Sequence, residues 1–158
     1  MAMTIMFKDG TQLYSVSHSV GYEQDNKTDD VMLVQFLLRK ISEYAGAYRP
    51  LGRPLAVDGV FGPLTHYWLI FFEYYTARQM SLHQGSVISD HALCMIKASG
   101  FDYDKSGVMY RLNRVYMMAY GKRDLSSLPE VPGILRRSLK SNVKKMDRTS
   151  DPEILSLK

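Results

Sequence analysis

The sequence predicts a mainly α fold with an N-terminal β-hairpin and one or two additional C-terminal helices. An Asp-Gly pair lies between two short extended segments near the N-terminus, which is typical of a hairpin. Further along, stretches with apolar residues at helical spacing alternate with turns rich in glycine and proline. With 158 residues, 46% hydrophobic and 23% charged, the chain is long and apolar enough for one folded domain with extensions.

The first predicted element is a hairpin over Thr4–Val16, turning at Asp9-Gly10. A polar loop follows, in which Thr28 or Asp29 can cap a helix from about Asp30 to Tyr44. The apolar residues of that helix fall on one face. They are Val31, Val34, Leu37, Leu38 and Ile41.

Three more helices follow, each bounded by turn or capping residues. We expect them over Pro63–Arg78, from Ser89 to near Gly100, and over Val108–Tyr120, where Gly121 stops the helix.

The last predicted helix covers residues 133–148 and has two stripes. The apolar stripe is Leu135, Leu139, Val143 and Met146, and the basic stripe is Arg136, Lys140, Lys144 and Arg148. Such a helix either docks by its apolar stripe with a solvated basic face or binds an anionic surface. The ten residues after it are expected to fray.

The stretch Val57–Thr65, "VDGVFGPLT", has a readable turn chemistry. The Asp58 carboxylate can accept from the backbone just after it, and Gly59 supplies the positive φ that the turn needs. Phe61 is then an apolar anchor. Gly62 permits a change of direction, and Pro63 begins the helix where its missing N–H costs nothing. A weaker copy of this unit lies at residues 83–91, "HQGSVISDH".

These motifs together resemble the small three-helix peptidoglycan-binding domain. The resemblance covers roughly residues 29–99 and predicts a three-helix peptidoglycan-binding-like bundle. The matching residues are Val31, Val34, Gln35 and Leu38 in the first helix, Val57, Asp58, Gly59, Phe61, Gly62 and Thr65 in the turn, and Trp68, Leu69 and Phe72 as core positions of the second helix. Glu73 departs from the family's usual glutamine, and the second unit has Gln84, Ile88 and His91 in place of aspartate, glycine and threonine.

The resemblance implies a non-catalytic module that recognises bacterial cell-wall glycan or stem peptide. Tyr67 and Tyr74 can stack on sugar rings, Arg78 or Arg53 can pair a carboxylate, and Asp58 and Gly59 complete the expected ligand-binding set. Alternatively, those aromatics only pack against the hairpin and the fourth helix. A second hypothesis is a protein–protein module on the same scaffold, as a component, adaptor or cargo of a phage-like or secretion machine, or as a homo-oligomer.

The sequence predicts no enzyme, metal or cofactor. The four histidines form none of the usual zinc-peptidase pairs, although His66, Glu73 and His83 are a conceivable ligand set. Cys94, the only cysteine, lies in an apolar stretch, which indicates a buried thiol. No phosphate-binding loop or nucleophile elbow is present.

Charge and hydropathy limit the expected partners and location. The chain has 20 Lys and Arg against 16 Asp and Glu, a mild excess that suits an anionic partner but identifies none. We expect peptidoglycan or a protein, and no nucleic acid. No Sec signal peptide or transmembrane segment is predicted, so we expect a protein that is cytoplasmic as made and that can then be exported by a non-Sec route or be associated with a phage.

We divide the chain into a hairpin and lead-in at 1–28, a peptidoglycan-binding-like domain at 29–100 and a helical extension with a basic tail at 101–158. One question stays open. Tyr67, Ile70, Phe71 and Tyr74 exceed what a minimal three-helix domain needs, and something has to cover them.

Overall fold

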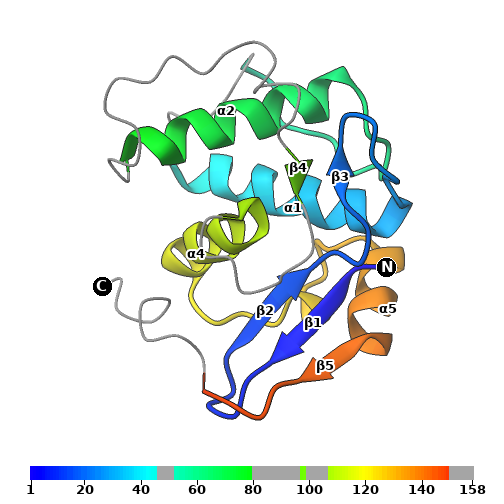
Figure 1. The fold of residues 1–158 in the computed structure, drawn as a ribbon, viewed down its shortest axis with the longest axis vertical. Coiled ribbons are helices and arrows are strands. Elements are labelled where there is room, and N and C mark those ends of the chain that lie inside the picture. Colours follow the sequence, from blue (N-terminus) through cyan, green and yellow to red (C-terminus); the bar gives the residue numbers. More distant parts are fainter. Residues whose placement is uncertain (46–51, 80–96, 99–106, 150–158) are drawn as a thin grey trace.

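The computed structural model describes residues 1–45, 52–79, 97–98 and 107–149 and shows four helices with a small three-stranded sheet, so the predicted mainly α fold with an N-terminal hairpin is confirmed. In Figure 1, α1 and α2 lie side by side towards one end of the molecule, and the sheet lies at the other. The elements are β1 (Met3–Met6), β2 (Gln12–Ser15), β3 (Val20–Gly21), α1 (Thr28–Ala45), α2 (Pro63–Gln79), β4 (Lys97–Ala98), α4 (Val108–Tyr120), the 3-10 turn η2 (Leu125–Ser127), α5 (Gly133–Ser141) and β5 (Val143–Lys145).

The N-terminal hairpin forms where the sequence predicts it. Strand β1 pairs antiparallel with β2, with Met3 opposite Ser15 and Met6 opposite Gln12. Gly10 has a φ of +77°, and the Thr11 amide donates to Asp9 Oδ1 at 3.0 Å. The turn therefore depends on the glycine and on the aspartate side chain before it.

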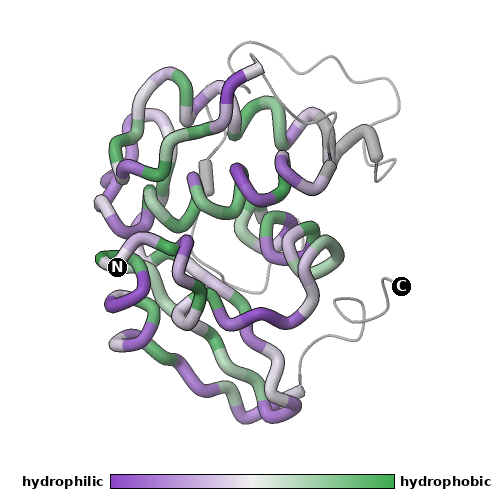
Figure 2. The backbone as a smooth tube through the Cα atoms, turned by 180° about the vertical axis from the view of Figure 1, so that it is seen from behind, coloured by the Kyte–Doolittle hydropathy of each residue, from purple (hydrophilic) through white to green (hydrophobic). Residues whose placement is uncertain are grey.

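Helix α1 is the centre of the core. It begins at Thr28, two residues before the predicted start, and its predicted apolar face is buried. Leu33 and Phe36, which lie off that face, are buried as well, because α1 contacts α2, α4 and α5. Hydrophobic residues of α1 accordingly lie in the middle of the molecule (Figure 2).

The second and fourth predicted helices are confirmed. Helix α2 runs one residue beyond the predicted end. Helix α4 has the predicted bounds, and Gly121, with a φ of +70°, ends it by donating its amide to Met117 O at 2.8 Å.

The predicted terminal helix over 133–148 is wrong beyond Ser141. Helix α5 ends there, and β5 pairs parallel with β1. The Thr4 amide donates to Asn142 O at 2.9 Å, and the Met146 amide donates to Met6 O at 2.8 Å. The open edge of β1 thus offers this segment backbone hydrogen bonds that compete with the helical ones. Leu135 and Leu139 are buried as predicted, but the four-residue basic stripe does not exist, because Lys144 and Arg148 lie outside the helix.

The predicted third helix cannot extend to Gly100. Lys97–Ala98 forms β4, which pairs antiparallel with β3 through Val20–Ala98 and Gly21–Lys97. The rest of that prediction, together with the second copy of the turn unit and Cys94, lies outside the described residues.

One large cluster of buried side chains joins the three segments into which we divided the sequence. It includes Tyr14 and Val20 from the N-terminal segment, Leu37 and Trp68 from the middle one, and Leu112 and Leu135 from the last. Across the described part of the chain, no helix combines the length and apolarity needed to cross a bilayer.

Candidate functional site

The turn before α2 is built around the side chain of Gln35. Its Nε2 donates to Asp58 Oδ1 at 2.9 Å, to Val60 O at 3.1 Å and to Thr65 Oγ1 at 3.1 Å. Its Oε1 accepts from the amides of Asp58 at 3.1 Å and Gly59 at 2.9 Å. The buried side-chain amide of Gln35 therefore serves the turn both as a hydrogen-bond donor and as an acceptor.

Asp58 and Gly59, two of the predicted ligand-binding residues, take part in this network. Asp58 is exposed, and its Oδ1 also accepts from the Val60 amide at 2.9 Å. That backbone hydrogen bond, together with the one from Gln35, lowers the pKa of the Asp58 carboxyl. Gly59 is buried with a φ of +76°, and a Cβ there would lie 2.5 Å from Thr28 Cγ2. Both residues fix the path of the chain into α2.

Helix α2 has one side in the core and an apolar side towards solvent. Trp68, Leu69 and Phe72 have no exposed surface, which confirms them as core residues. On the other side, Leu64, Tyr67, Ile70 and Tyr74 follow one another at spacings of three or four residues, so they form a continuous surface, which we call the outer face of α2.

The two tyrosines of the outer face are open to solvent. Tyr67 is 43% exposed and Tyr74 54%, while Ile70 is half-buried. Phe71 is also half-buried and packs against the core. The alternative that both tyrosines only pack against the hairpin and the fourth helix does not account for this exposure.

A small aromatic cluster extends the outer face at the start of α2. The His66 ring lies 6.1 Å from the Tyr22 ring and 6.0 Å from the Phe61 ring, centroid to centroid. Tyr22 is 56% exposed, and neighbouring Val60 is 65% exposed. Sequence reasoning singled out His66 only as a conceivable metal ligand and missed Tyr22, because their contact joins two segments about 44 residues apart and no local signal predicts it.

The remaining predicted contact residues lie apart or are not described. Arg53 is exposed in the segment before α2, and the side chain of Arg78 lies outside the described residues. Glu73 pairs with Arg111 of α4, and both side chains are largely buried. The Glu73 carboxylate is therefore already occupied by an ion pair. Within the described residues, no group of three His, Cys, Asp or Glu could hold a metal ion.

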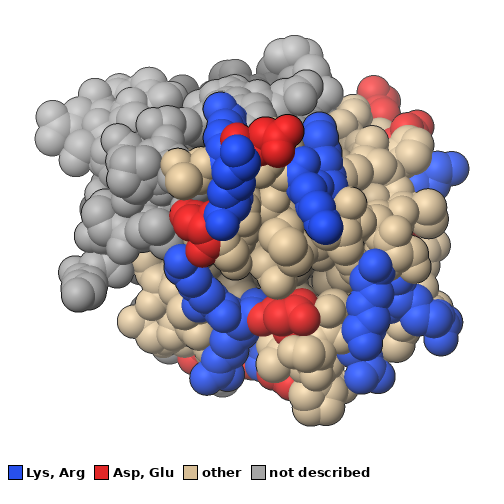
Figure 3. Space-filling model, turned by 90° about the horizontal axis from the view of Figure 1, so that it is seen from below, with Lys and Arg blue, Asp and Glu red and all other residues tan. Residues whose placement is uncertain are grey.

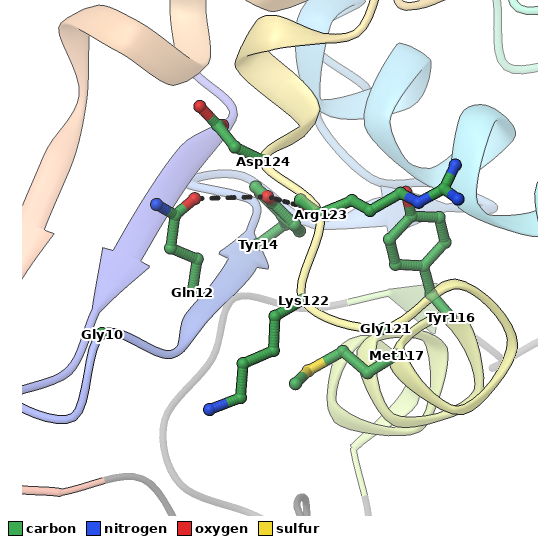
Figure 4. Close-up of a pocket in the computed structure, with 9 residues that line it drawn as sticks. All are labelled: Gly10, Gln12, Tyr14, Tyr116, Met117, Gly121, Lys122, Arg123 and Asp124. Carbon is green, nitrogen blue, oxygen red and sulfur yellow. Dashed lines mark hydrogen bonds between the residues drawn. The ribbon is translucent and has the colours of Figure 1, made fainter.

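A small cavity of about 60 Å³ lies between the hairpin and the end of α4 (Figure 4). At its wall the Tyr14 hydroxyl donates to Arg123 O at 2.9 Å and accepts from the Leu125 amide at 2.9 Å. Burial raises the pKa of Tyr14. Ligand sites for small molecules usually measure about 300–1,000 Å³, so this cavity is far smaller than a sugar-binding site.

Comparison with known proteins adds no assignment. No family model matches the chain, and neither a curated protein nor a solved structure matches it. Function has to be argued from the surfaces themselves, and the outer face of α2 is the surface that carries the predicted sugar-stacking residues.

Proposed function

We propose that this chain is a non-catalytic module of the peptidoglycan-binding type, which recognises bacterial cell-wall glycan or stem peptide through the outer face of α2. The proposed scaffold is the three-helix bundle that the sequence resembles, with α1 and α2 as its first two helices. The Gln35 network supports this scaffold, because it links the residues that carry the resemblance, Gln35, Asp58, Gly59 and Thr65, into one hydrogen-bonded unit.

The exposure of Tyr67 and Tyr74 carries the proposal. Burial of an aromatic side chain is favourable, so two tyrosines left open on a helix whose other side is fully buried need a reason. Tyrosine rings present an apolar face and a polar hydroxyl, which suits the C–H faces and hydroxyls of sugars. The two tyrosines are seven positions apart, about two helical turns, so their rings are spaced along the helix as a binding strip.

Sedimentation with isolated sacculi tests this function. We expect the protein to pellet with sacculi at low and at raised salt, because stacking on sugars is not screened by ions. Tyr67→Ala and Tyr74→Ala, separately and together, are expected to leave the protein in the supernatant. Tyr44→Ala is the matched control, because Tyr44 is 61% exposed on α1. Wild-type protein that stays in the supernatant would exclude wall binding.

A second candidate function is a protein–protein module, and the aliphatic residues beside the tyrosines favour it. Val60 is 65% and Leu64 38% exposed, and such side chains gain more from a protein partner than from a glycan. The module would then be a component, adaptor or cargo of a phage-like or secretion machine, or would form a homo-oligomer. Light scattering after size-exclusion chromatography would detect self-association, and Leu64→Glu would abolish it.

A further inference from the structure

A second surface, on the opposite side of the core, is formed by α5 and β5 and is strongly basic. Residues 133–149 contain six Lys or Arg and one acidic residue, Asp147. Five of the basic side chains are exposed, and we call this set the basic edge. It comprises Arg137, Lys140, Lys144, Lys145 and Arg148. Figure 3, which views the end of the molecule where the hairpin turn and β5 lie, shows many Lys and Arg side chains on this face, with a smaller number of Asp and Glu side chains between them.

The backbone of the basic edge is held in place by β1. After β5, the Met146 amide donates to Met6 O at 2.8 Å, and the Lys8 amide donates to Arg148 O at 3.1 Å. Lys8, which is also exposed, therefore lies next to Arg148. The backbone that carries these charges is ordered by its hydrogen bonds, so binding of a partner requires little further ordering of the backbone.

The lysines of this edge differ from the cations that form ion pairs elsewhere in the described part of the chain. Lys40 pairs with Glu43 and Glu130, and Arg111 pairs with Glu73. Within the described part of the chain, no ion-pair partner is recorded for Lys140, Lys144 or Lys145. Lysines on an edge strand also discourage pairing with other sheets. That role accounts for β5 but not for Arg137 and Lys140, which lie on α5.

Aliphatic side chains are interleaved with these cations. Ile134 is 50% exposed and lies one turn before Arg137 on the same side of α5, with Ser141 another turn on. Ser141 and the 43% exposed Val143 line one shallow groove with Lys144. No aromatic residue occurs in residues 133–149, so the stacking groups that single-stranded nucleic acids use are missing from this segment. Aliphatic anchors among lysines match the interface of an anionic bilayer.

We propose that the basic edge docks the protein on anionic phospholipid membranes, with Ile134 and Val143 entering the headgroup region. This inference is independent of wall binding, because it uses a different face and different residues. The sequence predicts these C-terminal charges on one amphipathic helix. The structure distributes them over a helix and a strand.

Vesicle sedimentation of the full chain tests the proposal, with phosphatidylcholine vesicles that contain or lack phosphatidylglycerol. We expect binding only to the anionic vesicles. Lys144→Glu/Lys145→Glu and, separately, Arg137→Glu/Lys140→Glu should each weaken the partition coefficient more than about tenfold, since each basic residue near an anionic surface contributes strongly. Arg39→Glu/Arg53→Glu makes the same charge change elsewhere and should retain wild-type binding. Circular dichroism checks that each variant is folded. Because the two charge-reversal variants are independent, the test still stands if one of them does not fold.

Two further arms separate membrane docking from general attraction to polyanions. Ile134→Ser/Val143→Ser keeps every charge, and we expect it to weaken vesicle binding, most clearly at raised salt, where apolar insertion dominates. Fluorescence anisotropy with a labelled DNA duplex gives the other arm. Duplex binding without vesicle binding would overturn the proposal. Wild-type vesicle binding by Ile134→Ser/Val143→Ser, or weakened vesicle binding by the Arg39→Glu/Arg53→Glu control, would overturn it as well.

Discussion

At the scale of single residues, the turn before α2 depends on a glycine that no other residue can replace cheaply. A Cβ at Gly59 would lie 2.5 Å from Thr28 Cγ2 and 2.8 Å from Thr28 O, in a backbone with a φ of +76°. Gly10 has nearly the same φ, +77°, but nothing lies within 4 Å of its position for a Cβ. Comparing a substitution at Gly10 with one at Gly59 therefore separates the cost of backbone strain from the cost of a steric clash.

We predict that Gly59→Ala lowers the free energy of unfolding by more than about 2 kcal/mol, since the strain of positive φ adds to the clash with Thr28. Gly10→Ala is the matched control and should cost about 1 kcal/mol. Urea denaturation followed by circular dichroism measures both. Equal losses in the two variants would mean that α1 moves away from the turn without penalty.

Gln35 is the other residue on which the turn depends. Removing its side chain leaves the buried amide of Gly59 without its 2.9 Å acceptor and Thr65 without its donor. We predict that Gln35→Ala lowers the free energy of unfolding by at least about 2 kcal/mol. Gln24→Ala is the control, because the side-chain amide of Gln24 donates to Tyr22 O at an exposed site. A Gln35→Ala loss as small as that of the control would show that water replaces the network.

At the scale of elements, Glu73 and Arg111 link α2 to α4. Their side chains are only 18% and 11% exposed, so loss of one partner leaves the other charge poorly solvated. We predict that Glu73→Gln, which keeps the shape, costs about 2 kcal/mol of stability. A double-mutant cycle with Arg111→Met measures the coupling. The effects of the two substitutions should be clearly non-additive, and simple additivity would show that the pair is not coupled in solution.

The elements that the sequence predicts correctly have local signals. Asp9-Gly10 defines the hairpin, Gly121 ends α4, and the spacing of Trp68, Leu69 and Phe72 identifies the buried side of α2. The exposure of Tyr67 and Tyr74 follows from the same spacing, because they lie on the opposite side of the helix.

The elements that it misses depend on contacts between distant segments. Residues 133–146 have a good helical pattern, yet Val143–Lys145 pairs with β1, about 140 residues earlier in the chain. Lys97–Ala98 likewise pairs with β3. Hydrophobic periodicity carries no information on where an open strand edge is available, and tertiary pairing overrides local preference there. The Tyr22–His66 contact at the candidate site escapes prediction for the same reason.

At the scale of the whole molecule, Asp29 joins the N-terminus, the start of α1 and α5. Its Oδ2 accepts from the Ala2 amide at 2.8 Å and from Ser138 Oγ, and Ser138 Oγ also lies 3.2 Å from Ala2 O. Burial raises the pKa of Asp29, but the hydrogen bonds from Ser138 and Ala2 and the N-terminal ammonium outweigh it, so the net pKa lies below its ordinary value. The ionised form is therefore favoured by folding.

This shift predicts how stability depends on pH. Because the folded pKa of Asp29 is below the unfolded one, about 3.9, its contribution is complete at neutral pH and is lost as the pH falls through the folded pKa. We predict that Asp29→Asn lowers stability at pH 7 by about 1 kcal/mol and flattens the decline below about pH 4. Exposed Asp25 provides the control, and Asp25→Asn should keep the wild-type curve. Urea unfolding across this pH range measures all three proteins. If Asp29→Asn declined as steeply as the wild type, the acid sensitivity would belong to other carboxylates, and the link between the N-terminus and α5 would not depend on ionised Asp29.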